Sequence, residues 1–229
     1  MNYSIIKQPD ELRQFINWLP CLAEDETYYL CLFARKKYCN DPTQLLADKQ
    51  QLKRFTTNKE RMLEKIRQLE CEIGTYYQKN VPVPPESLAL YITPNPRSCQ
   101  KAAKASLIKL AEVVTQPYNG YNPHSLIMNQ LQVACGTKHF IDLDFDTEDP
   151  EDIARALRAV ITPGAMQLLR TRGGLHALIE PHRLAPALQK SWYSTCTRIT
   201  GCDARGDNLI PVPGCSQGGF VPYFMATKL

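Results

Sequence analysis

The chain has 229 residues, of which 44% are hydrophobic and 22% are charged, a balance that is ordinary for a globular protein and excludes extensive disorder. Its formal net charge is +4. So small a positive excess permits a polyanionic partner such as nucleic acid without indicating one.

Cysteine use and the lack of long apolar runs bear on the compartment. Nine cysteines are spread along the sequence with no CxxC pair, so we predict reduced, mostly buried thiols rather than a disulfide framework. A zinc site assembled from scattered Cys and His stays a less favoured alternative, because close ligand pairs are missing. The N-terminus lacks the apolar run of a signal peptide and no stretch is long enough to span a bilayer. We therefore expect a cytoplasmic protein with no membrane partner.

Residues 1–85 are expected to form a smaller N-terminal α/β lobe. An apolar, aromatic run at 28–33 predicts a strand. The polar segment 43–77 is rich in helix-forming residues and predicts a long basic helix. Its Lys- and Arg-rich face is either a solvated surface, which is the commoner case, or a template-binding face. The Pro-rich stretch VPVPP at 81–85 predicts a connector, after which residues 86–229 form the second unit.

After the connector, a run at 88–93 predicts a second strand, and the Ala- and Lys-rich segment 99–114 predicts a helix. If the two strands at 28–33 and 88–93 are parallel neighbours, a right-handed crossover brings their carboxyl ends to one edge of the sheet. Open α/β sheets bind ligands at that edge, so cations there are candidates for phosphate or template contacts. Basic residues after strands are also commonplace, and both interpretations stay open. These cations are Arg35, Lys36, Lys37 and Arg97.

The segment HFIDLDFD predicts a strand on which Asp142, Asp144 and Asp146 share one face, because side chains alternate along a strand. Asp142 and Asp144 would lie about 6.6 Å apart along the strand. At that spacing they can reach a shared centre of two divalent ions. Hard oxygen ligands suit Mg²⁺ or Mn²⁺. The alternative is a half-exposed strand with an acidic outer face, although repeated Asp disfavours a strand unless something offsets the repulsion.

Further along, helices are expected at 151–160, capped by Asp149, and at 184–199. Between them, the sequence LLRTRGGLHALI places two strand-like runs around a Gly-Gly turn. Arg172 precedes this turn and His176 follows it. An imidazole and a guanidinium beside a metal site are suitable donors to a triphosphate, although a lone His in a strand is more often structural.

A third motif, CDARGDNLIPVPG, bears on the remaining metal ligand, because a two-metal site needs more than two carboxylates. Glu180 would lie about 13 Å beyond His176 along an extended strand, too far to share the site. Asp207 stands in the turn-like tripeptide GDN, where capping of the turn explains it. Asp203 can enter a strand beside the first two aspartates and is the predicted third ligand. Asp146 is its strong competitor.

In this order, a DxD on a strand, a Gly-rich turn leading into His, and an Asp-bearing segment running into a Pro-containing strand resemble the motifs of the archaeo-eukaryotic primase superfamily. The resemblance is closest to the bifunctional primase-polymerase branch found on plasmids, phages and CRISPR-linked loci. It covers roughly residues 88–224. Upstream, YITPNPR at 91–97 resembles the strand ending in Asn-Pro-Arg that precedes the DxD in many of these proteins.

The resemblance implies an α/β (α+β) protein in which an RRM-like catalytic sheet packs on the smaller N-terminal lobe. In that family the DxD binds the catalytic metals, the His contacts the incoming nucleotide, and a later acidic residue completes the metal site. These roles fall on Asp142 and Asp144, on His176 and on Asp203. Further nucleotide-binding cations are expected at Arg172, Arg205 and Lys138.

The implied activity is that of a template-directed DNA primase or polymerase that adds nucleotides during replication or repair. Its cofactors would be two Mg²⁺ or Mn²⁺ ions and its substrates NTPs or dNTPs. A DNA template and primer are the expected partners, together with a helicase or other replication protein acting in trans.

There are two alternatives, one a different enzyme and one a binding module. A rolling-circle initiator endonuclease shares the sheet architecture but needs paired histidines, and the four histidines of this chain include no HxH. A catalytically silent primase-like module that only holds nucleic acid in a replication or mobile-element complex stays open.

Overall fold

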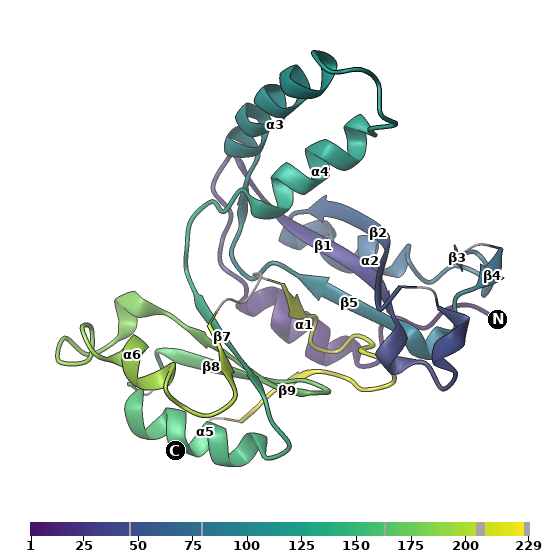
Figure 1. The fold of residues 1–229 in the computed structure, drawn as a ribbon. Helices are drawn as coiled ribbons and strands as arrows, with labels where there is room; N and C mark the ends of the chain where they lie inside the picture. The colour runs from purple at the N-terminus through teal and green to yellow at the C-terminus, as the bar shows by residue number, and fades with distance from the viewer. Residues whose placement is uncertain (46, 79, 163, 205–208, 227–229) are drawn as a thin grey trace.

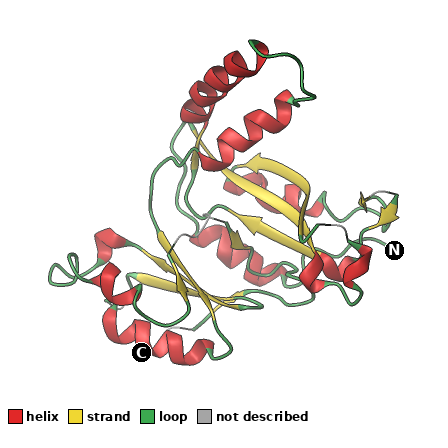
Figure 2. Cartoon of the chain, in the orientation of Figure 1, coloured by secondary structure: helices red, strands yellow, loops and turns green. Residues whose placement is uncertain are grey.

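The computed structural model describes residues 1–45, 47–78, 80–162, 164–204 and 209–226. Within these residues the chain is a mixed α/β protein of the α+β class, built on two five-stranded antiparallel sheets (Figures 1 and 2). This class agrees with the sequence prediction.

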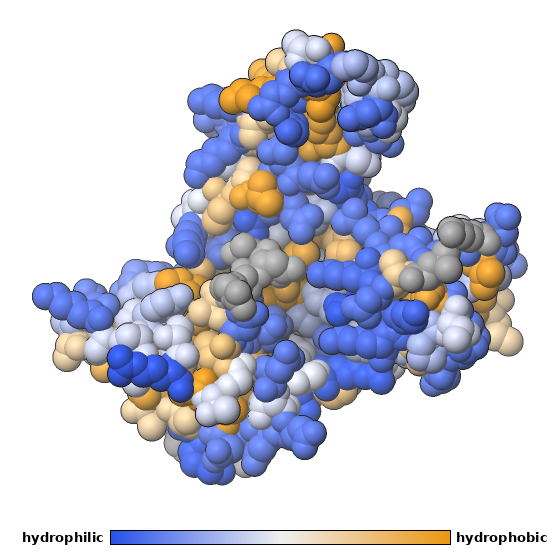
Figure 3. Space-filling model, viewed as in Figure 1, coloured by the Kyte–Doolittle hydropathy of each residue, from blue (hydrophilic) through white to orange (hydrophobic). Residues whose placement is uncertain are grey.

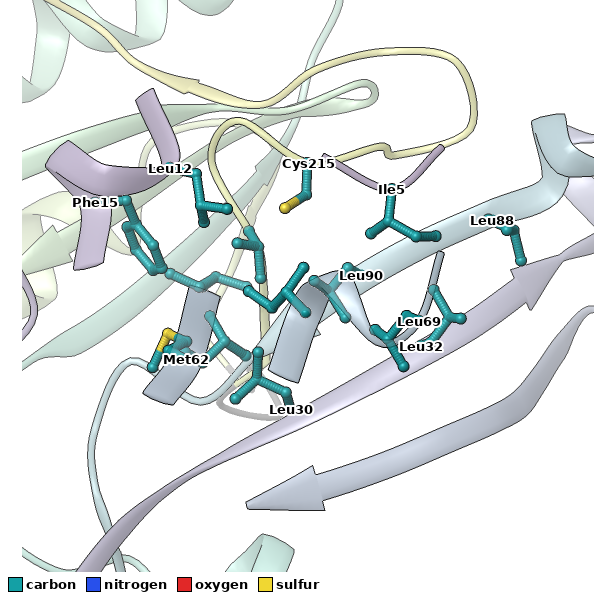
Figure 4. Packing of buried hydrophobic residues seen from close by; sticks show 14 of the residues in the cluster. Ile5, Leu12, Phe15, Leu30, Leu32, Met62, Leu69, Leu88, Leu90 and Cys215 are labelled. Carbon is teal, nitrogen blue, oxygen red and sulfur yellow. The ribbon is translucent and has the colours of Figure 1, made fainter. Parts of the chain in front are cut away.

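The first sheet is organised around one long strand, β1 (Glu26–Arg35), which is buried along most of its length. The other strands are β2 (Lys49–Thr57), β5 (Leu88–Ile92), β6 (Arg97–Ser98) and β11 (Ile210–Pro211). β1 lies between β2 and β5, β6 pairs with the start of β1, and β11 pairs with β5. On one face, Leu30 and Leu32 of β1 pack with apolar side chains of α1 (Pro9–Trp18) and α2 (Lys59–Arg67) to form the main core (Figure 4).

The second sheet has β9 (Gly174–Ile179) between β7 (Ile141–Asp146) and β8 (Met166–Arg170). β10 (Cys202–Asp203) extends it beyond β7, and β12 (Tyr223–Phe224) extends it beyond β8. One face is covered by α5 (Pro150–Val160) and α6 (Trp192–Cys196), as Figure 1 shows. The other face contacts the first unit through Phe140, Leu169 and Leu178, which share the main core with β1.

Two helices form an arm that projects from one end of the first sheet (Figure 1), where residues of α4 (Pro123–Val133) form hydrogen bonds with Tyr29 of β1 and Arg54 of β2. α3 (Cys99–Val114) packs against α4, and the predicted helix at 99–114 is confirmed with the same bounds. The arm leaves apolar side chains exposed beside hydrophilic ones (Figure 3), among them Leu107, Ile108 and Val114.

The remaining described elements are short. They are the two-stranded β3 (Tyr77–Gln78) and β4 (Val81–Pro82), and the 3₁₀ turns η1 (Lys36–Tyr38), η2 (Pro42–Gln44), η3 (Pro85–Ser87) and η4 (Pro181–Arg183). In the described part of the chain, no helix has both the length and the apolar composition needed to cross a membrane.

Strand direction in the first sheet corrects one prediction. β1 and β5 are antiparallel, so their carboxyl ends lie at opposite ends of the sheet. Arg35 is the last residue of β1, whereas Arg97 pairs with Thr27 near its start, about 26 Å away by the rise per residue. The parallel arrangement was wrong because nothing local in a sequence fixes the direction in which two distant strands pair.

Two helix predictions were also wrong. The segment 43–77 contains the edge strand β2 followed by α2, because the polar run from Lys49 pairs with β1 over its whole length. The segment 184–199 forms a helix only at α6, and several turns with Pro and Ser precede it. The helix at 151–160 forms as α5, and Asp149 caps it by accepting from the Asp152 amide. The boundary expected after residue 85 separates β1 and β2 from β5, which are strands of one sheet.

Asn95 joins the first sheet to the strand that carries the aspartates. It lies between β5 and β6 and is only 2% exposed. Its Oδ1 accepts from the backbone N–H groups of His139 and Phe140, both at 2.8 Å, and its Nδ2 donates to the Phe140 carbonyl at 2.9 Å. β7 begins one residue later. The Asn of the NPR motif therefore fixes where this strand starts.

Replacing Asn95 with Ala should lower the free energy of unfolding by about 3 kcal/mol, because a buried donor and acceptor of Phe140 and a part-buried donor of His139 lose their partner. Urea denaturation followed by circular dichroism measures the change. Asn17→Ala, on the exposed side of α1, is the matched control and should stay within about 0.5 kcal/mol of wild type. A loss of similar size in the control would show that Asn95 has no special part in the joint.

Candidate functional site

The alternation of β7 places its acidic and apolar side chains on opposite faces of the second sheet. Leu143 and Phe145 are completely buried and pack in the cluster formed with α5 and α6. Asp142, Asp144 and Asp146 therefore point to the face that looks toward the first sheet.

Pairing with two neighbouring strands brings further polar side chains to Asp144. His176 of β9 is its partner on one side and Asp203 of β10 is its partner on the other. Directly opposite residues of an antiparallel pair project to the same face. The prediction that Asp203 enters a strand beside the DxD is confirmed. The Gly-Gly turn is also required here, because a Cβ on Gly174 would lie 1.8 Å from the Phe145 carbonyl oxygen.

His176 lies between the two aspartates of the DxD. Its Nδ1 donates to Asp142, at 3.0 Å from Oδ1 and 3.2 Å from Oδ2, because an ionised carboxylate can only accept. Its Nε2 faces Asp144 Oδ1 at 3.6 Å. The side chain of Asp142 is 6% exposed and that of Asp144 is 39% exposed. Asp142 thus holds the imidazole from the interior, and Asp144 is the more open carboxylate.

The surroundings raise the pKa of Asp144 above its ordinary value. Burial is the largest cause. His176 acts in the opposite direction, while the charges of Asp142, Asp146 and Asp203 add to the rise. Because burial and neighbouring negative charges both disfavour the ionised form of Asp144, a cation bound beside it would stabilise that form.

Cations of the first sheet face this acidic row across a cleft of about 350 Å³. The cleft is lined on one side by the four aspartates and His176, and on the other by Arg35, Lys37 and Lys49. Tyr91 accepts a hydrogen bond from Arg35 Nη1 at 3.1 Å and so orients this guanidinium. The same cavity therefore presents oxygen ligands on one wall and positive charge on the other (Figure 1 shows the two sheets that form it).

The other predicted cations are placed elsewhere. Lys36 does not line the cleft, and Arg97 is 1% exposed at the far end of β1, which corrects its assignment to template contact. Lys138 is exposed but outside the cleft lining. Arg172 contacts a tyrosine ring and a backbone carbonyl. Arg205, like Asp207, lies outside the described residues.

Several lining residues were not predicted from the sequence. They are Tyr38, Lys49, Tyr91, Thr171, Leu209, Pro211 and Gln217. Tyr91 belongs to the YITPNPR segment, which was the one available signal. Lys49 begins an edge strand that was itself missed, and Gln217 lies in a loop with no local pattern.

The donor set fits Mg²⁺ or Mn²⁺ better than zinc, because the accessible ligands are carboxylate oxygens. In the described residues, no three His, Cys, Asp or Glu side chains are already gathered as a metal cage. Asp144 and Asp203 instead form an open acidic edge beside the cleft. An open edge suits an ion that keeps water and substrate phosphates among its ligands.

Comparison with protein-family models, with curated proteins and with solved structures finds no match to this chain. A function for the cleft therefore follows from its own geometry and chemistry.

The raised pKa of Asp144 predicts how stability depends on pH. Because the folded-state pKa is raised, Asp144 favours the fold when protonated, and this contribution is lost as the pH rises through the folded pKa. In the presence of a chelator, Asp144→Asn should melt at a higher temperature than wild type at pH 7. The difference should shrink as the pH falls toward the ordinary value of 3.8.

Calorimetric melting curves across this pH range measure the difference. Asp152→Asn is the matched control, because Asp152 is exposed in the first turn of α5 and forms an ion pair with Arg155. It should bring no gain in melting temperature. Equal melting temperatures of wild type and Asp144→Asn at pH 7 would contradict the raised pKa.

Proposed function

We propose that the cleft is the site of a metal-dependent, template-directed nucleotidyltransferase of the primase-polymerase kind, with the second sheet as its RRM-like catalytic sheet. One observation carries the proposal: a single cleft has clustered carboxylates on one wall and cations on the other. A nucleoside triphosphate with divalent ions needs both, because the ions require anionic ligands and the phosphates require positive charge.

The acidic wall would hold the ions. Asp144 and Asp203 are paired across β7 and β10, and Asp142 is next to them on the same face. Two divalent ions bound there would supply activation of the attacking hydroxyl and neutralisation of the leaving pyrophosphate. Asp146 lies one step further along the same face and is the remaining candidate ligand.

The basic wall would hold the triphosphate. Arg35 is the central residue, because its Nη1 is fixed by Tyr91 and its Nε is buried without a hydrogen-bond partner among the described residues. A buried guanidinium N–H without a partner is unfavourable, and a phosphate oxygen in the cleft would satisfy it. Lys37 and Lys49 add point charges at the same wall. Catalysis would then consist mainly of positioning and charge neutralisation.

His176 would act on the nucleotide from the acidic side. Its Nδ1 is engaged by Asp142, which leaves Nε2 directed toward Asp144 and the cleft. A fixed imidazole in this position is suited to contact a phosphate of the bound nucleotide. The proposed partners are a DNA template and primer, and a helicase or other replication protein in trans. NTPs and dNTPs are equally compatible with these contacts.

The direct test is incorporation of a labelled nucleotide onto a primed DNA template with Mg²⁺ or Mn²⁺. The Asp142→Ala, Asp144→Ala double variant should lose incorporation while its circular dichroism spectrum is retained, because removing like charges from one strand face relieves repulsion. Binding of DNA without incorporation by the wild type would favour the silent nucleic-acid-binding module. Full activity in the folded double variant would refute the proposed site.

Asp203 provides a second prediction on the ligand set. Asp203→Asn should lower kcat/KM for incorporation by about 100-fold or more, because it removes a charged ligand next to Asp144. Glu180→Gln is the matched control, since Glu180 forms ion pairs with Arg183 and His182 outside the cleft. Asp207→Asn is also expected to cost little, although Asp207 lies outside the described residues. Comparable losses for Asp207→Asn and Asp203→Asn would move the ligand to the later position.

A further inference from the structure

The turn between β8 and β9 makes a second contact, with the η1 turn that follows β1, at the opposite end of β7 from Asn95. Arg172 of this turn places its guanidinium over the ring of Tyr38, 4.6 Å from the ring centroid. Its Nη1 donates to the carbonyl of Gly218. The guanidinium is thus held both by its electrostatic contact with the Tyr38 ring and by its hydrogen bond to the Gly218 carbonyl.

Gln217 connects the same two residues through both ends of its side-chain amide. It is 4% exposed, and its Oε1 accepts from the Arg172 backbone N–H at 2.8 Å. Its Nε2 donates to the Tyr38 hydroxyl at 3.3 Å. Gly218 has φ +62°, and a Cβ there would lie 2.3 Å from Tyr38 Cγ. Only glycine allows such close packing in this backbone conformation.

These contacts join the two walls of the cleft. Tyr38 ends η1, directly after the cations of the basic wall, and the Arg35 and Lys37 charges lie 5.6 Å and 5.5 Å from its ring. Arg172 stands two residues before Gly174, which pairs with Asp146 at the end of the acidic row. Tyr38 and Gln217 themselves line the cleft.

We propose that Arg172, Tyr38 and Gln217 form a clamp that sets the separation between the basic wall and the acidic row, with Arg172 as a positioning residue. The proposal rests on the proposed function, since the separation matters only if one substrate spans both walls. The role of Arg172 in this clamp differs from that of a residue that contacts a phosphate. The guanidinium is occupied by Tyr38 and Gly218, and Arg172 is not among the residues that line the cleft.

The two roles predict different responses to Lys. A phosphate contact needs charge, so Arg172→Lys would retain most of the activity. A clamp needs the planar guanidinium that stacks on the ring and donates to the carbonyl, so Arg172→Lys should behave like Arg172→Ala. We expect both variants to raise KM for the nucleoside triphosphate by about tenfold, because the phosphates no longer reach both walls. Rescue by Lys would overturn the clamp.

A double-mutant cycle tests whether Arg172 acts through Tyr38. Tyr38→Leu should raise KM as Arg172→Ala does, and the increase in the double variant should be smaller than the product of the two single increases, because both changes remove the Arg172–Tyr38 contact. If the increase in KM in the double variant equals the product of the two single increases, Arg172 and Tyr38 act independently, which would contradict the clamp. Arg155→Ala is the control, since Arg155 is an exposed arginine of α5 paired with Asp152. It should leave KM unchanged.

Metal binding separates positioning from general loss of structure. Calorimetric titration of the protein with Mn²⁺ alone should give the same affinity for wild type and Arg172→Ala, because all the proposed carboxylate ligands belong to the second sheet. Loss of Mn²⁺ binding in Arg172→Ala would show that the acidic row itself is disturbed and would overturn the clamp.

A further measurement distinguishes failure of the clamp from failure of the proposed function. If the wild type transfers no nucleotide, the proposed function fails, and the same cycle is measured on the free energy of unfolding and on hydrogen exchange of the Arg172 amide. Non-additive unfolding energies, with faster exchange in Tyr38→Leu, support the clamp. Additive energies and unchanged exchange overturn it.

Discussion

The two-residue period of β7 is the constraint on which the site depends. Leu143 and Phe145 must be buried against α5 and α6, and this requirement turns Asp142 and Asp144 to the other face. On that face the neighbouring strands supply Leu178 opposite Asp142 and Leu169 opposite His176, and these apolar residues attach the second sheet to the first. They also supply the polar His176 and Asp203 on either side of Asp144. If this face of the second sheet were wholly apolar, the two sheets would pack together and leave no cleft. If it were wholly acidic, no apolar side chain would attach the second sheet to the first.

The two walls of the cleft carry opposite charges. Burial is the largest cause of the raised pKa of Asp144, and the like charges of Asp142, Asp146 and Asp203 add to it. His176, which Asp142 holds in place, lowers the pKa of Asp144, while Arg35 and Lys49 face the acidic row from the first sheet. The partners that best satisfy both walls are cations on the acidic side and a polyanion on the basic side. A nucleotide bound with divalent ions has this distribution of charge, with the ions on one side and the phosphates on the other.

How much of this can be predicted from the sequence depends on whether the signal is local. The alternation in IDLDFD and the Gly-Gly turn are local, and β7 and the β8–β9 hairpin follow from them. The pairing of Asp203 with Asp144 joins distant segments, and it was predicted only because a two-metal site needs a further carboxylate. The direction of β5 against β1 and the existence of β2 depend on pairing between distant segments, so both were missed. The basic wall is the least predictable part. Lys49, Tyr91 and Gln217 come from separate segments and meet only in the folded chain.

Diffraction from crystals grown with Mn²⁺ and a non-hydrolysable nucleoside triphosphate tests the central claim most directly. Anomalous scattering from Mn²⁺ locates the ions directly. The account predicts Mn²⁺ peaks against the carboxylates of Asp144 and Asp203, with the triphosphate extending from these ions toward Arg35. Mn²⁺ bound away from β7, or a nucleotide bound outside the cleft, would contradict it.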